Sequence, residues 1–357
     1  MKKSLAILMF TVFFAVLCTG CKASTPSTPS GESSENNATE TAPSYPIRDI
    51  RCVVPFGAGG GTDLIAREMA GLVQKNIGKG MVVENVGGAS GSVGMQTVFN
   101  APTDGYTIAF ASETMMTFNA MKLVDLDYDD FDFVNLFAVI PNVLVTSPDS
   151  PYKSFDDVIK AAKANPGKVT VATTGAGTVT DIAFSLMEKI HGVKFNKVAF
   201  NGSGEAVTAI LGKQVDLYNA GMHALGEYVR SGKMIPLVAF ANEPVPAGQG
   251  MADIPAVSSL YPEYKGYMPC GPFFGAMVKT GTPKDIEDKL VEEFAKAWKS
   301  DEFQKYLKES NFVPLGLSGE EARTYVKNLQ SKFCWMLYEM GITDVEPSTY
   351  GVAKPQS

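Results

Sequence analysis

Short β-branched runs alternate with helix-length amphipathic stretches along most of this chain, and this alternation constrains the fold more than any other feature. The first cycle reads as a strand at 50–55, a helix at 62–77 and a strand at 81–84. Such alternation is typical of βαβ units, in which helices cover parallel strands. The sequence therefore predicts an α/β protein with mixed, mostly parallel sheets.

The alternation runs twice, which predicts two domains. It restarts at Ser154, and extended segments near 140–147 and 265–278 would carry the chain between the two halves. We expect a discontinuous domain 1 (47–145 and 270–357), which includes the C-terminal helices, and a domain 2 (146–269). In open α/β sheets, ligands bind outside the carboxyl ends of parallel strands. A ligand cleft between the two domains is therefore expected.

The N-terminus predicts export. Two lysines precede the apolar run Leu5–Leu17, which is followed by small residues and Cys21. This pattern resembles the signal peptide of a bacterial lipoprotein, with residues 1–20 removed and Cys21 lipidated; an ordinary secretory signal is the alternative. Residues 21–46 are almost devoid of apolar side chains and are expected to form a disordered tether. The predicted location is extracytoplasmic, anchored to the membrane through Cys21.

Composition narrows the possible activities. The net charge is −7, without clusters of Lys or Arg, which argues against nucleic acid as a partner. Cys52, Cys270 and Cys334 are odd in number and widely spaced, so we expect buried free thiols and no zinc site. The two histidines, His191 and His223, lie in no metal-binding or catalytic motif. No cofactor is expected, and no residue pattern argues for an enzyme.

Three loops rich in Gly, Ser and Thr follow predicted strands and lead into helices, at 57–61, 173–181 and 200–206. The first is no phosphate-binding loop, because Asp63 stands where a lysine is required and Thr62 replaces the third glycine of a dinucleotide fingerprint. Bare backbone at a helix N-terminus can still bind an anion. The loops favour an anion of modest charge held by amides and hydroxyls, or else they only close tight turns.

Several stretches resemble one family. The block 53–112, beginning VVPFGAGGGTDLIAREM, and the later stretches ILGKQVDLY (210–218), IPAVSSLYPEY (254–264) and VKTGTPKDI (278–286) closely resemble the tripartite tricarboxylate transporter receptors, or Bug-type solute-binding proteins. The resemblance covers residues 47–340. It implies a type II-like periplasmic-binding-protein fold that closes around a small organic carboxylate and delivers it to integral-membrane permease subunits.

The resemblance also implies which residues bind the ligand. The first strand–helix loop and its counterpart in domain 2 would grip carboxylate groups. Carried onto this chain, the predicted residues are Phe56, Gly57, Ala58, Gly59, Thr62 and Asp63, then Thr174, Gly177, Thr178 and Asp181. Ser112, Asn201, Gly202 and Asn219, at or just after the ends of other predicted strands, complete the set. Departures from the family pattern at Asp181, Ala220 and Phe273 leave the ligand unnamed.

Asp181 has two interpretations. Thr178 and Asp181 have the spacing of a capping box, in which the acid reaches back to the amide of Thr178. Alternatively, Asp181 and Asp63 face the cleft without a cation and repel ligands that carry several carboxylates. An amino-acid-like ligand, or a carboxylate with an uncharged tail, would then be preferred.

The function that we expect is a monomeric, lipid-anchored receptor of a tripartite tricarboxylate-type uptake system. Two other functions share the same fold. A sensory module would present the ligand to a membrane receptor kinase, and a hydrolase or lyase would transform it.

Overall fold

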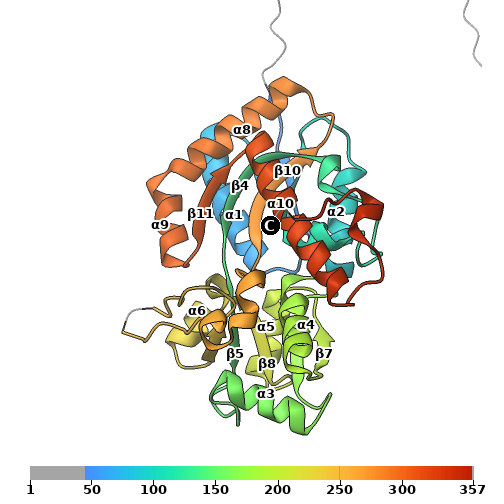
Figure 1. The fold of residues 1–357 in the computed structure, drawn as a ribbon. Helices are drawn as coiled ribbons and strands as arrows, with labels where there is room; N and C mark the ends of the chain where they lie inside the picture. The colour runs from blue at the N-terminus through green and yellow to red at the C-terminus, as the bar shows by residue number, and fades with distance from the viewer. Residues whose placement is uncertain (1–44, 249, 356–357) are drawn as a thin grey trace, which may run out of the picture. The chain divides into compact units, whose positions relative to one another are not determined.

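The computed structural model describes residues 45–248 and 250–355, and these fold around two mixed sheets (Figure 1). We call the part built on the six-stranded sheet lobe A and the part built on the five-stranded sheet lobe B. Lobe A has the strand order β11-β4-β10-β3-β1-β2, and lobe B has β7-β6-β8-β5-β9. The strands are β1 (Ile50–Val54), β2 (Met81–Asn85), β3 (Thr107–Ser112), β4 (Phe131–Val139), β5 (Asn142–Thr146), β6 (Thr170–Thr173), β7 (Asn196–Ala199), β8 (Leu217–Gly221), β9 (Ile235–Ala239), β10 (Phe273–Lys279) and β11 (Val313–Leu317).

The predicted α/β fold with mixed sheets is confirmed, although parallel pairs do not dominate. Pairing is parallel for β1–β2, β1–β3, β6–β7 and β6–β8. The other pairs, which involve β4, β5 and β10, are antiparallel. The difference arises because β5 and β10, which belong to the segments that pass between the lobes, and the edge strand β11 run against the βαβ strands of their sheets.

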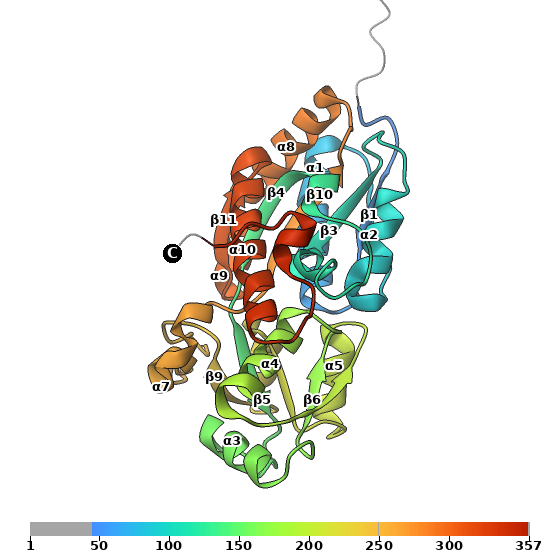
Figure 2. The same cartoon turned by 45° about the vertical axis from the view of Figure 1, so that its right-hand side comes forward.

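Helices cover both faces of each sheet (Figure 2). In β1, Ile50, Cys52 and Val54 belong to the hydrophobic cluster that includes side chains of α1, α8 and α9, whereas Val53 belongs to the cluster with α2 and α10. Both faces of this strand are therefore buried, which explains its nearly continuous apolar sequence. The helices are α1 (Gly61–Ile77), α2 (Ser92–Phe99), α3 (Phe155–Ala164), α4 (Val179–His191), α5 (Ser203–Leu211), α6 (Met222–Arg230), α7 (Val257–Leu260), α8 (Lys284–Lys299), α9 (Asp301–Glu309) and α10 (Gly319–Glu339).

Two crossing segments connect the lobes. The amide of Ile140 donates to the Pro272 carbonyl at 3.0 Å, and the amide of Asn142 donates to the Cys270 carbonyl at 3.0 Å. Gly271 lies so close to the neighbouring segment that a Cβ there would be 1.9 Å from the Ile140 carbonyl oxygen. The two segments are thus hydrogen-bonded side by side where they pass from one lobe to the other.

Some expectations lie outside the described residues, and one element was missed. The predicted signal peptide, Cys21 and nearly all of the tether are not among the residues described. Strand β11 was not predicted, because its sequence VPLGL contains Pro and Gly and joins the sheet only as an edge strand beside β4. The buried free thiols at Cys52, Cys270 and Cys334 are confirmed. No helix within the described ranges is long and apolar enough to cross a membrane.

Candidate functional site

A small cavity of about 50 Å³ lies between the two lobes, and it is the candidate ligand site. Both lobes contribute to its wall. Its lining residues are Phe56, Gly60, Gly61, Thr62, Ser112, Glu113, Thr114, Asn142, Thr174, Val179, Thr180, Ser203, Ala220, Gly221, His223, Pro272 and Phe274. Of the described residues that line it, none is lysine or arginine.

Four helices begin at this cavity. The first residues or N-cap residues of α1, α4, α5 and α6 are among its lining residues, namely Gly61, Val179, Ser203 and Gly221. Three of the four N-cap residues are glycine, which has no side chain to cap the helix, and the fourth, Thr178, makes no capping hydrogen bond. The first amides of a helix lack intrahelical acceptors and carry a partial positive charge. The four helix N-termini therefore bring partial positive charge to the cavity, although none of its described lining residues is a cation.

The loops of the two lobes touch, so the lobes are in a closed arrangement. The Gly57 amide donates to the Asn201 carbonyl at 3.0 Å, and the Thr117 hydroxyl donates to the Gly177 carbonyl at 2.9 Å. A Cβ at Gly204 would lie 2.7 Å from the Ala58 carbonyl oxygen. Here the glycines allow two backbones from different lobes to approach each other, in addition to any role toward a ligand.

Asp63 braces the first loop from within lobe A. Its carboxylate accepts hydrogen bonds from the Gly59 amide at 2.9 Å and from Asn85 Nδ2 at 2.9 Å. It also lies 2.8 Å from the guanidinium of Arg67, one turn along the helix. Burial alone would raise the pKa of Asp63, but the hydrogen bonds from Arg67, Gly59 and Asn85 hold it below its ordinary value. This carboxylate is committed to the loop and is not among the cavity-lining residues.

Asp181 has the equivalent role in lobe B. Its Oδ2 accepts from the Gly177 amide at 3.0 Å, one residue before the amide that a capping box would use. The Thr178 hydroxyl instead donates to the Gly175 carbonyl. Lys197 Nζ lies 3.0 Å from Asp181 Oδ1. The predicted capping box is therefore wrong, because Asp181 accepts from the Gly177 amide and not from the Thr178 amide. The predicted repulsion of ligands with several carboxylates also loses its basis, because Asp63 is paired with Arg67 and Asp181 with Lys197. Lys197 lies in β7, and only the tertiary structure brings it to Asp181 in α4.

Glu113 is the acid that does line the cavity. It follows directly after β3, its residue is 4% exposed, and within residues 45–248 and 250–355 no group donates a hydrogen bond to its Oε2. Burial raises its pKa to about 7, against the lowering effect of the Glu113 and Val179 amides and the Ser112 hydroxyl. Sequence reasoning missed this residue, although its place at the carboxyl end of a buried strand was a usable signal.

His223 is the second residue that the sequence did not identify. It extends from lobe B onto lobe A, with its ring 4.9 Å from that of Phe312 and 5.2 Å from that of Phe274. A Cβ on Gly61 would lie only 1.7 Å from its Nε2. Burial lowers the pKa of His223 to about 3, so the imidazole is neutral at physiological pH. Its spacing from other residues in the sequence gave no indication of this position.

The structure brings together only part of the predicted set. Phe56, Thr62, Ser112 and Thr174 line the cavity. Ala58 and Gly59 are exposed, and Thr178 bonds within its own loop. Gly57, Gly177, Asn201 and Gly202 lie where the loops of the two lobes meet, and Asn219 lies behind Asn142, to which it is hydrogen-bonded. Contact of these residues with a ligand remains a prediction.

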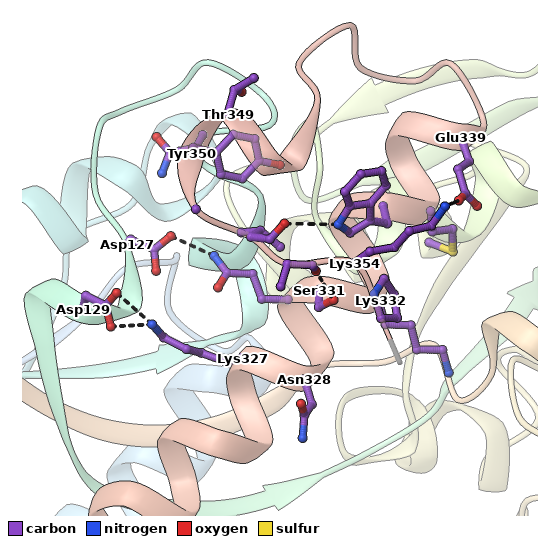
Figure 3. Close-up of a pocket in the computed structure, with 18 of the residues that line it drawn as sticks. Asp127, Asp129, Lys327, Asn328, Ser331, Lys332, Glu339, Thr349, Tyr350 and Lys354 are labelled. Carbon is purple, nitrogen blue, oxygen red and sulfur yellow. Dashed lines mark hydrogen bonds and ion pairs between the residues drawn. The ribbon is translucent and has the colours of Figure 1, made fainter. Parts of the chain in front are cut away.

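A wider hollow of about 1220 Å³ lies beside α10 and the C-terminal segment of lobe A (Figure 3). All of its lysines are engaged with an acid or with backbone. Lys327 Nζ is 2.6 Å from Asp129 Oδ1, Lys354 Nζ is 3.8 Å from Glu339, and Lys332 donates to the Met268 carbonyl. None of the three glycine-rich loops lines this hollow. We therefore place the candidate site in the smaller cavity, where the helix N-termini meet.

Comparisons with known proteins identify the family of this chain. Residues 65–342 match the family model described as the tripartite tricarboxylate transporter family receptor. The chain is similar to protein BugT of Bordetella pertussis (strain Tohama I), with 28% identity over 306 residues, or 84% of this chain and 92% of that protein. It is also similar to the solved structure of the periplasmic binding protein BugD, at 28% identity and a TM-score of 0.77, covering 84% of this chain and 99% of that one. A solved periplasmic transporter is 29% identical, with a TM-score of 0.74 over 84% and 98% of the two chains.

Proposed function

Because the chain belongs to the tripartite tricarboxylate transporter receptor family, and is thus an extracytoplasmic solute-binding receptor of the Bug type, we propose that its interlobe cavity binds a small organic carboxylate. The ligand would enter while the lobes are apart and be enclosed when the loops at Gly57 and Asn201 meet. The family likeness gives the receptor role, and the cavity supports the class of ligand.

The observation that carries this proposal is the meeting of four helix N-termini at a cavity without cationic side chains among its described lining residues. Backbone amides and the hydroxyls of Thr62, Ser112 and Thr174 can donate to a carboxylate. A ligand with several carboxylates would have no full positive charge to balance it. The small volume of the closed cavity also favours a compact molecule.

A panel of ligands tests this proposal by thermal shift on the full-length chain in detergent. A ligand at 100 times its Kd stabilises the folded form by about 2.7 kcal/mol. We expect mono- and dicarboxylates to raise the melting temperature, and neutral sugars and metal ions to leave it unchanged. A response to sugars together with no response to any carboxylate would overturn the proposal.

Anchoring and delivery are further parts of the proposal. Residues 1–21 have the pattern of a lipoprotein signal, so the receptor would be tethered through Cys21 and would hand its ligand to permease subunits. Cys21→Ala should release the protein from membranes or leave it unprocessed. A mature-sized mutant that still fractionates with membranes would contradict the lipid anchor.

We propose binding without chemistry. His223 lines the cavity but is neutral, and its ring is packed between Phe274 and Phe312. Turnover of an ester or a hydroxy acid by the purified chain would favour the enzyme alternative instead. Presentation of the ligand to a receptor kinase uses the same cavity, and partner capture in membranes would distinguish it from transport.

A further inference from the structure

Two oxygen atoms in the cavity wall are buried acceptors without a donor. In the part of the chain that the structure describes, Glu113 Oε2 and Asn142 Oδ1 have no hydrogen-bond partner. The two residues are 4% and 1% exposed, and both line the interlobe cavity. Leaving a buried polar atom without a partner is unfavourable, and more so when the group is charged. A ligand that donates to both atoms would recover this energy.

The orientation of Asn142 follows from its neighbours. Asn219 Nδ2 donates to the Thr180 carbonyl at 2.9 Å, and a carbonyl can only accept. Asn219 Oδ1 must therefore accept the other bond, and Asn142 Nδ2 donates to it at 2.8 Å. The amide oxygen of Asn142 is thereby left on the free side. This chain of bonds keeps an acceptor, and not a donor, at the cavity wall.

The surroundings of Glu113 supply no counter-charge. The titratable groups that interact with it are the buried Tyr128 and Cys270, and burial raises the pKa of both. Both are neutral at physiological pH. The cavity thus has amide donors at the helix N-termini, and its wall also contains the carboxylate of Glu113, which accepts from the Val179 amide, and the amide oxygen of Asn142. A buried carboxylate is stabilised by a cation that hydrogen-bonds to it.

We propose that Glu113 and Asn142 bind an ammonium group, so that the preferred ligand is a compact amino carboxylate whose carboxylate lies at the helix N-termini. An ammonium group has three N–H donors, of which Glu113 and Asn142 would accept two. This inference rests on the proposed carboxylate-binding function and specifies its ligand class. It also transfers the role that the sequence suggested for Asp63 and Asp181 to a different acid.

Matched ligand pairs test this inference. We would measure binding of alanine against propionate, and of aspartate against succinate, by calorimetry on the full-length chain in detergent at pH 8. Each pair differs by the ammonium group alone. The wild type should bind the amino member of at least one pair at least about tenfold more tightly, which is the lower end of the range for a charge-assisted hydrogen bond.

The isosteric variant Glu113→Gln should reduce that preference, measured as the ratio of the two affinities, by at least about tenfold. Glu302→Gln is the control, because it removes the same charge from an exposed ion pair with Lys75. A wild type that binds the deaminated member equally well would overturn the ammonium site and leave the carboxylate function standing. An unchanged preference in Glu113→Gln would do the same. Failure of every carboxylate to bind would overturn both proposals.

Discussion

Gly61→Ala should separate ligand binding from folding. Gly61 is the first residue of α1 in lobe A, and its backbone accepts any L-residue, but a Cβ would lie 1.7 Å from Nε2 of His223 in lobe B. Ordinary van der Waals contact begins at 3.4 Å. The imidazole has little room to retreat, because it packs on Phe274 and Phe312 and because Gly221 lies against its Nδ1. The added methyl group should therefore oppose the closed arrangement of the lobes.

The expected cost is that of overpacking, about 1–3 kcal/mol. Because the clash exists only when the lobes meet, the cost should fall on ligand affinity, which would weaken by roughly 5- to 150-fold. Calorimetry with the carboxylate that gives the largest thermal shift measures this change, and small-angle scattering should show a larger radius of gyration. Gly71→Ala in the same helix is the matched control, since its Cβ meets nothing within 4 Å. That control should leave affinity unchanged and stabilise the exposed helix position by about 0.5–1 kcal/mol. Wild-type affinity and dimensions in Gly61→Ala would refute the reasoning.

Three further outcomes are expected. Asp63→Asn should destabilise the fold by about 1–3 kcal/mol in urea unfolding at pH 7, because the variant loses the ion pair with Arg67 and weakens the hydrogen bond that the carboxylate accepts from the Gly59 amide. An unchanged midpoint would show that Asp63 does not brace the loop. Gly271→Ala should cost about 1–3 kcal/mol or more, since its Cβ would lie 1.9 Å from the Ile140 carbonyl oxygen, and a wild-type melting temperature would contradict the close approach of the crossing segments. Folding raises the pKa of Glu113 from 4.5 to about 7, so Glu113 contributes stability below pH 4.5 that is lost as the pH rises through 7. Folding lowers the pKa of His223 from 6.5 to about 3, so His223 contributes stability above pH 6.5 that is lost as the pH falls through 3. Between pH 4.5 and 6.5 these two effects change the free energy of unfolding in opposite directions. Removing the first effect by Glu113→Gln should therefore make the free energy of unfolding fall on acidification by up to about 1.4 kcal/mol per pH unit. Urea unfolding at pH 5, 5.5 and 6 measures this dependence, and the same dependence in variant and wild type would show that Glu113 and His223 do not cause it.

Local pattern determined most of the fold. The β-branched run at 50–54 and the amphipathic period of 61–77 depend on near neighbours in the chain, so the strand and helix could be predicted from them alone. The glycine-rich loop between them was also correctly placed as a strand-to-helix turn. Strand β11 escaped prediction, because Val313–Leu317 becomes a strand only by pairing with β4.

The site depended on tertiary structure. Asp63 is four residues from Arg67, yet its commitment to the loop also needs Asn85 from β2, and Asp181 is neutralised by Lys197 from β7. Conversely, Glu113 and Asn142 share a cavity although Glu113 directly follows β3 and Asn142 begins β5, 29 positions later. Whether an acid is paired or free depends on which side chains the fold brings within hydrogen-bond distance. The number of residues between two side chains in the sequence does not predict that distance. The sequence alone therefore determined the class of receptor and the loops at its cleft, whereas only the tertiary structure decided which carboxylate lines the cavity, because that depends on how the two lobes meet.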